Sequence, residues 1–145
     1  MSTWIIVADS SRARIFSMED VRSPLQEITD MLHPASRLRE QDIGTDRQGR
    51  TFDSRGQGRH AKEGDVSIKK QEAINFSREI ANYLDSGCNK NLFEKLIIIA
   101  PPEFLGLLRK DIGNTTKNRV SREIGKDLTQ RDESHIRREV NTLPD

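Results

Sequence analysis

The sequence predicts an α/β domain in which helices flank a mixed β-sheet. Three features indicate this class: an apolar N-terminal hairpin over 4–18, a long amphipathic stretch that starts near Asp65, and a largely apolar run over 92–100. The hairpin supplies antiparallel strands, whereas the later run follows a helical crossover and is expected to pair in parallel. With 145 residues, the chain has the length of one domain.

The first three predicted strands follow one another closely. Residues 4–8 are a short β-rich apolar run, typical of a strand covered on both faces. Asp9 opens a turn cluster and is expected to act as a turn former, after which 12–18 alternates as the second arm of the hairpin. Residues 25–32 fit a strand or a helix, but the prolines on either side leave little room for a helix and favour a third strand.

The composition changes sharply between Pro34 and Asp65. Large apolar residues are almost absent, and five of the nine glycines fall in this segment. Residues 34–62 carry seven basic residues against four acidic ones, a local excess of three positive charges. Such a segment cannot bury enough apolar surface to offset its ordering entropy. We therefore expect residues 36–64 to form a mobile Gly/Arg loop.

Helical periodicity starts directly after this segment and predicts a helix over about 65–85. The apolar stripe of that helix consists of Val66, Ala73, Phe76, Ile80 and Leu84. The run over 92–100 is rich in β-branched residues, as in a central buried strand. Residues 103–113 lie between prolines and a glycine and predict a short amphipathic helix. Residues 120–128 fit an edge strand or a helix, and 132–143 fit a polar terminal helix.

The sequence lacks the usual patterns of cofactor and metal sites. No glycine fingerprint follows the first strand, and no phosphate loop ends in Gly-Lys-Ser/Thr. The three histidines lie far apart, and the single cysteine, Cys88, cannot complete a zinc set. Cys88 itself follows Asp85-Ser86-Gly87 and is expected in a turn. We therefore predict no cofactor and no metal.

The distribution of apolar residues also bears on location. No segment approaches the ~18 apolar residues that a membrane span needs. The N-terminus has no basic region ahead of its short apolar run, so it does not resemble a signal peptide. We expect a cytoplasmic protein with no membrane partner, and composition and spacing define no oligomeric state.

One segment carries residues suited to binding a phosphate-rich molecule. It consists of Arg55, Gly56, Gln57, Gly58, Arg59 and His60. The two glycines beside Gln57 let the backbone approach another molecule closely. The two arginines and the histidine supply donors suited to phosphate. Two interpretations stay open: a loop that enters an RNA- or phosphate-rich site, or an ordinary flexible Gly/Arg loop without a ligand.

Several segments resemble the bacterial host-attachment protein family, described as required for attachment to host cells. They are the opening hairpin, the loop 55–61, the strand and turn over 97–109, and Lys126-Asp127-Leu128-Thr129. The resemblance covers nearly the whole chain, and its more specific parts are Ala-Pro-Pro-x-Phe-Leu-Gly and Lys-Asp-Leu-Thr. That family is in turn similar to the central domain of archaeal and eukaryotic class-1 translation release factors.

The resemblance implies a ribonuclease-H-like mixed sheet with flanking helices, in a single release-factor-like domain over 1–145. Gly56 and Gln57 would align with the second glycine and the glutamine of the release-factor Gly-Gly-Gln motif, while Arg55 stands in place of the first glycine. Gln57 would then be the catalytic residue, positioning water for ester hydrolysis. The residues that would bind RNA or phosphate are Arg55, Gly56, Gly58, Arg59 and His60.

Two functions of different classes follow from the resemblance. The release-factor likeness implies the ribosome or tRNA as a partner and peptidyl-tRNA ester hydrolysis as a candidate activity. The family description instead favours a non-enzymatic protein-interaction module whose loss disturbs attachment to host cells indirectly.

Overall fold

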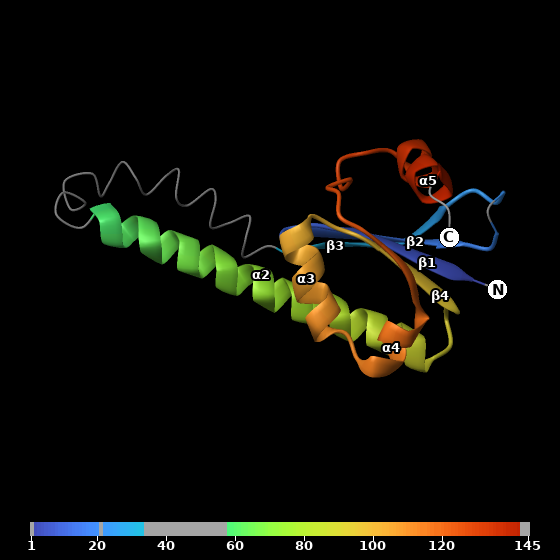
Figure 1. The fold of residues 1–145 in the computed structure, drawn as a ribbon, viewed down its shortest axis with the longest axis horizontal. Coiled ribbons are helices and arrows are strands. Elements are labelled where there is room, and N and C mark those ends of the chain that lie inside the picture. Colours follow the sequence, from blue (N-terminus) through green and yellow to red (C-terminus); the bar gives the residue numbers. More distant parts are fainter. Residues whose placement is uncertain (1, 21, 34–57, 143–145) are drawn as a thin grey trace.

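The centre of the protein is a mixed β-sheet with strand order β3-β2-β1-β4-β5 (Figure 1). It is seen in a computed structural model that describes residues 2–20, 22–33 and 58–142, with side chains placed throughout except at 58–66 and 142. The strands are β1 (Thr3–Ala8), β2 (Arg12–Met18), β3 (Gln26–Leu32), β4 (Lys95–Ile99) and β5 (Val120–Ile124). β1 pairs antiparallel with β2 and parallel with β4, and β5 is parallel to β4. The predicted α/β class, with a mixed sheet and flanking helices, is confirmed.

β1 and β4 lie next to each other at the centre because their apolar runs suit burial on both faces. Ile6 of β1 pairs with Ile98 of β4, and the side chains of both are fully buried. β3 lies at one edge of the sheet, where alternate side chains face solvent. The strand interpretation of 25–32 is therefore confirmed, and the strand within 120–128 covers Val120–Ile124 at the other edge.

Helices cover both faces of the sheet, and each covered face has its own apolar cluster (Figure 1). The helices are α2 (Gly58–Asn89), α3 (Pro102–Asp111), α4 (Asn114–Arg119) and α5 (Glu133–Thr142). Phe76 and Ile80 of α2 and Leu108 of α3 pack on the face that carries Ile98. Ile136 and Val140 of α5 pack on the opposite face.

α2 is longer at both ends than the periodicity predicts. Residues 58–64, expected in the Gly/Arg loop, belong to the helix, which also continues past Asp85 to Asn89. Extending an existing helix adds one hydrogen bond for each residue fixed, so glycines near its ends do not prevent it from continuing. Cys88 therefore lies in the last turns of α2, with 1% of its surface exposed, and not in a turn. The rest of the predicted loop, 36–57, lies outside the described residues.

Polar contacts fix the helices to one another. The carboxylate of Asp85 in α2 accepts hydrogen bonds from the backbone N–H of Gly113 (3.0 Å) and from the hydroxyl of Thr116 (2.5 Å), both at the start of α4. Ser77 of α2, fully buried, donates to a carboxylate oxygen of Asp111 in α3 at 2.7 Å. The short α4 was not predicted, because its six polar residues show no apolar period.

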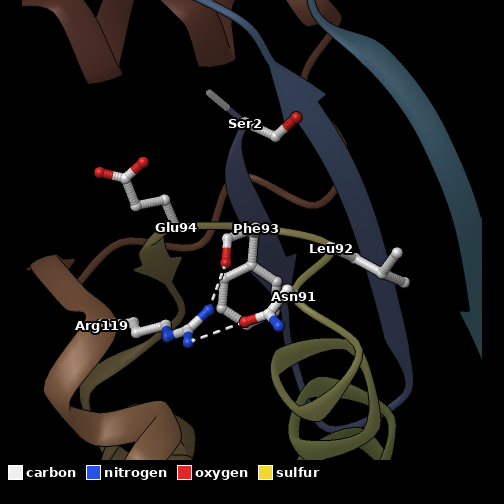
Figure 2. Close-up of a pocket in the computed structure, with 6 residues that line it drawn as sticks. All are labelled: Ser2, Asn91, Leu92, Phe93, Glu94 and Arg119. Carbon is white, nitrogen blue, oxygen red and sulfur yellow. Dashed lines mark hydrogen bonds between the residues drawn. The ribbon is translucent and has the colours of Figure 1, made fainter.

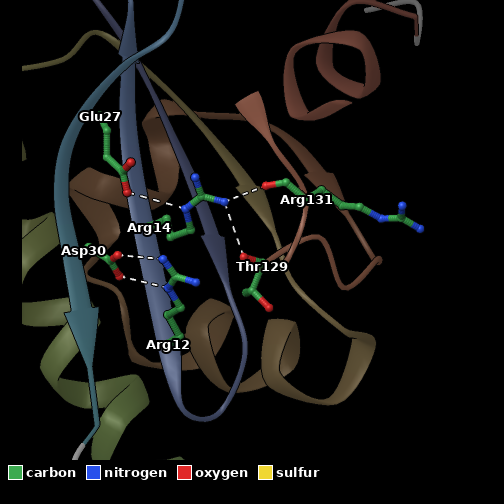
Figure 3. Close-up of polar contacts among 6 residues, drawn as sticks. All are labelled: Arg12, Arg14, Glu27, Asp30, Thr129 and Arg131. Carbon is green, nitrogen blue, oxygen red and sulfur yellow. Dashed lines mark hydrogen bonds and ion pairs between the residues drawn. The ribbon is translucent and has the colours of Figure 1, made fainter. Parts of the chain in front are cut away.

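On the α5 side, two arginines of β2 connect three parts of the chain (Figure 3). Arg12 holds Asp30 of β3 through two hydrogen bonds of 3.0 and 2.7 Å, and the Asp30 carboxylate raises the pKa of the Arg12 guanidinium. Arg14 contacts Glu27 at 3.4 Å and donates to the carbonyl oxygens of Thr129 and Arg131 at 3.3 and 2.7 Å. The segment that leads into α5 is thereby fixed to the sheet.

Candidate functional site

The residues predicted to bind RNA or phosphate lie at and just before the start of α2. Gly58, Arg59 and His60 are the first three residues of the helix, although their side chains are not described. Arg55, Gly56 and Gln57 lie outside the described residues. Gln57, the predicted catalytic residue, is thus the neighbour of the first residue of a 32-residue helix.

The amino-terminal part of α2 extends well past the strands (Figure 1). Among the described side chains, the hydrogen bond to the sheet nearest this end joins Glu72 to His33. Glu72 is fourteen positions after Gly58, so about 21 Å of helix precede that bond. The first turn of α2 contains no acidic residue. The first N–H groups of a helix lack partners within it and form its positive end, which favours anions.

A junction between β3 and α2 holds the projecting helix on the sheet. Nε2 of His33, which directly follows β3, lies 2.7 Å from Oε1 of Glu72, and both side chains are mostly buried. The His33 ring also stacks on Phe76, one turn further along α2, with 5.0 Å between the ring centroids. These contacts join His33, the last described residue before 34–57, to the middle part of α2, so they fix where α2 leaves the sheet.

Asp9 forms the predicted turn and also a contact that the sequence did not indicate. Its Oδ1 accepts hydrogen bonds from the backbone N–H groups of Ser11 and Arg12 at 2.9 and 2.8 Å. Its Oδ2 lies 3.0 Å from Oγ1 of Thr129, which is 1% exposed and equally 3.0 Å from Oδ1 of Asp127. Asp127 and Thr129 follow β5, and no local pattern pairs them with a residue 120 positions earlier.

A second region, at the amino ends of β1 and β4, holds a cavity of about 500 Å³ (Figure 2). Arg119 is the cationic group on its wall, but its guanidinium donates to the carbonyl oxygen of Phe93 at 2.7 Å and to Oδ1 of Asn91 at 3.2 Å. Asn91 is held in the left-handed region with φ of 57°. These contacts indicate that Arg119 fixes the connection between α2 and β4.

Neither a metal cluster nor a membrane-spanning helix is found in the part of the chain that the structure describes. That part contains no group of three or more His, Cys, Asp or Glu side chains able to hold a metal ion. None of its helices is both long enough and apolar enough to cross a membrane.

The fold defines an α/β protein with a mixed sheet and a long projecting helix that begins at a Gly/Arg segment. The model of the family described as "Protein required for attachment to host cells" matches residues 4–140, and the chain belongs to this family. An uncharacterised protein of Rickettsia prowazekii (strain Madrid E) is 32% identical over 77 residues, which are 52% of this chain and 51% of that protein.

A solved structure is also similar to the chain. The crystal structure of the archaeal translation termination factor aRF1 aligns with a TM-score of 0.45 and 14% identity, over 95% of this chain and 37% of that one. The chain therefore matches about half of the relative's length and a little over a third of the termination factor.

Proposed function

We propose that this host-attachment family protein acts in the cytoplasm on the ribosome or on tRNA, through the Gly/Arg segment at the start of α2. In this proposal Arg55, Arg59 and His60 bind phosphate, and Gly56 and Gly58 let the backbone approach the RNA. Gln57 positions a water molecule for attack on the ester of peptidyl-tRNA. The observation that supports the proposal is the position of Gly58, Arg59 and His60 at the amino end of a helix that extends beyond the sheet.

Charge and reach both support a phosphate-rich partner. A helix start without acidic residues favours an anion, and arginine provides the donor geometry that phosphate oxygens match. About 21 Å of helix before the junction at Glu72 gives the segment a reach that a loop at the sheet surface lacks. A narrow site inside a larger particle requires such a reach.

Binding is tested by co-sedimentation of the protein with ribosomes across a range of salt concentrations. Each phosphate contact contributes about one unit to the slope of log K against log salt. Replacing both Arg55 and Arg59 by Ala should weaken association and lower that slope by about two units. The matched control replaces Arg78 and Lys90 by Ala, because both are exposed and neither forms an ion pair among the described residues.

Hydrolysis is tested by release of a labelled peptidyl group from tRNA, with and without ribosomes. Gln57→Ala should abolish release while binding stays within about twofold, because one amide orients water but adds little to contacts dominated by arginine and phosphate. Binding without release by the unchanged protein would reduce the proposal to an RNA-binding role. Absence of both would favour a protein-interaction module that affects attachment indirectly.

A further inference from the structure

A cavity of about 750 Å³ lies at the carboxyl ends of β1 and β4. Its described walls come from the turn after β1, the middle of α2, the first turns of α3 and the segment after β5. Lys69, the first described residue of α2 on its wall, is eleven positions after Gly58, or about 16 Å along the helix. Crevices at the carboxyl ends of parallel strands are common ligand sites in α/β sheets.

Apolar side chains form part of the lining of this cavity. Ala73 and Ile74 of α2 and Phe104 and Leu107 of α3 line it. Phe104 is buried in the core cluster, while Ala73 and Leu107 are partly buried and pack against that cluster. The apolar wall of the cavity is therefore held in place by the core. The volume of the cavity lies within the ~300–1,000 Å³ of typical ligand pockets.

Charged side chains of both signs also line the cavity, and they form few hydrogen bonds or ion pairs with the described residues. Lys69 and Lys70 are exposed and form no ion pair among the described residues, and the same holds for Glu103. Asp127 uses one oxygen to contact Thr129, and its Oδ2 has no hydrogen bond within the described residues. The cavity thus has two ammonium groups without an ion pair among the described residues, and three carboxylates, of which Glu103 and Asp127 can accept further donors.

The contact between Asp9, Thr129 and Asp127 adds to the acceptor capacity of the acidic side. Oγ1 of Thr129 lies 3.0 Å from an oxygen of each carboxylate, yet a hydroxyl has one proton and donates to one of them at a time. One carboxylate oxygen therefore always lacks that donor. A positively charged group of a ligand would satisfy it.

We propose that this cavity binds a short peptide of about two to four residues with a free ammonium group and a free carboxylate. The ammonium group lies against Glu103 and Asp127, the carboxylate against Lys69 and Lys70, and an apolar side chain against Phe104. A ligand with charges of one sign, such as a polyphosphate, would meet like charges at one side of the cavity. A single amino acid would fill only a small part of the volume.

The probe is the tripeptide Leu-Ala-Leu with free ends, added to the full-length ¹⁵N-labelled protein and followed by NMR. Saturable shifts are expected at the backbone amides of Ser10 and Leu107, both at the cavity. N-terminal acetylation and C-terminal amidation should each weaken binding about fivefold, because each removes one charged contact. No saturable shift at millimolar peptide, or shifts confined to another region, would overturn the proposal.

Paired variants assign each end of the peptide. Replacing Lys69 and Lys70 by Ala should weaken binding of the free acid but not of the amide. Glu103→Gln should weaken binding of the free amine but not of the acetylated peptide, and it leaves the Asp127–Thr129 contact intact. The control, Lys95→Ala, should leave all affinities unchanged, since Lys95 lies at the opposite end of β4. Equal affinity of free and capped peptides would contradict the proposal.

This inference is independent of the proposed action on ribosomes or tRNA. Gln57→Ala and the Arg55 and Arg59 variants should bind the tripeptide as the unchanged protein does. Loss of peptide binding with RNA binding retained would refute only the cavity proposal, and the converse would refute only the proposed function.

Discussion

Single residues connect segments far apart in this chain, and Thr129 shows this most directly. Its buried hydroxyl lies between Asp9, at the end of β1, and Asp127, after β5, at 3.0 Å from each. Because Asp9 also accepts the backbone N–H groups of the β1–β2 turn, this hydroxyl joins the hairpin to the carboxyl-terminal part of the fold.

Thr129→Val tests this connection. Valine has nearly the shape of threonine but no donor, so the partly buried Asp9 oxygen loses its protein partner. We expect a loss of about 1–2 kcal/mol in the free energy of unfolding, measured by urea denaturation. Thr115→Val, at an exposed position in α4, should stay within about 0.5 kcal/mol. Equal effects of the two substitutions would show that the contact does not contribute to stability.

At the scale of elements, two helical glycines have opposite surroundings. A Cβ atom at Gly87 in α2 would lie 2.8 Å from two ring carbons of Trp4, whereas a Cβ at Gly106 in α3 would have no neighbouring atom within 4 Å. Glycine is thus required at 87 for the close approach of β1 and α2. At 106 it only lowers the stability of the helix.

The pair predicts substitutions of opposite sign. Gly106→Ala should raise the free energy of unfolding by about 0.5–1 kcal/mol, the difference in helix propensity. Gly87→Ala should lower it by about 1–3 kcal/mol, because the indole ring of Trp4 must move. Thermal and urea unfolding measure both, and stabilisation by Gly87→Ala would contradict the observed packing.

Gly87 also explains part of what the sequence could and could not predict. The central strands β1 and β4 were predictable because their apolar runs have the length and β-branched content that burial selects. Gly87 and its neighbours suggested a turn, yet α2 continues through Gly87. Glycine is needed at this position because the ring of Trp4 packs closely against it. Likewise, composition placed 58–64 in a loop although it begins the helix.

The candidate site was predictable only as a local segment. Its two glycines and its basic residues are close together in the sequence, at the start of α2 or just before it. The cavity at the strand ends escaped prediction because Lys69, Phe104 and Asp127 come from three elements. The mixed sheet brings those elements together, and no local sequence pattern predicts that they lie side by side.

The molecule as a whole depends on a sheet that is apolar on both faces. Along β4, Ile98 faces the cluster beneath α2 and α3, while Ile97 and Ile99 face the cluster beneath α5. Neither helical layer can be removed without exposing one of these clusters to water. The stability of the chain should therefore depend most on the central strands and little on its edges.

Ile98→Ala tests this dependence. The side chain is fully buried in the centre of the sheet, and truncation to alanine removes apolar contacts and leaves a cavity between β4 and the helices. We expect a loss of about 2–5 kcal/mol in the free energy of unfolding, with an unchanged dependence on urea concentration. Ile28→Ala removes the same atoms from the edge strand β3, where 40% of the side chain is already exposed, and should cost below about 1 kcal/mol. A loss below about 0.5 kcal/mol for Ile98→Ala would mean that β4 does not occupy the centre of the core.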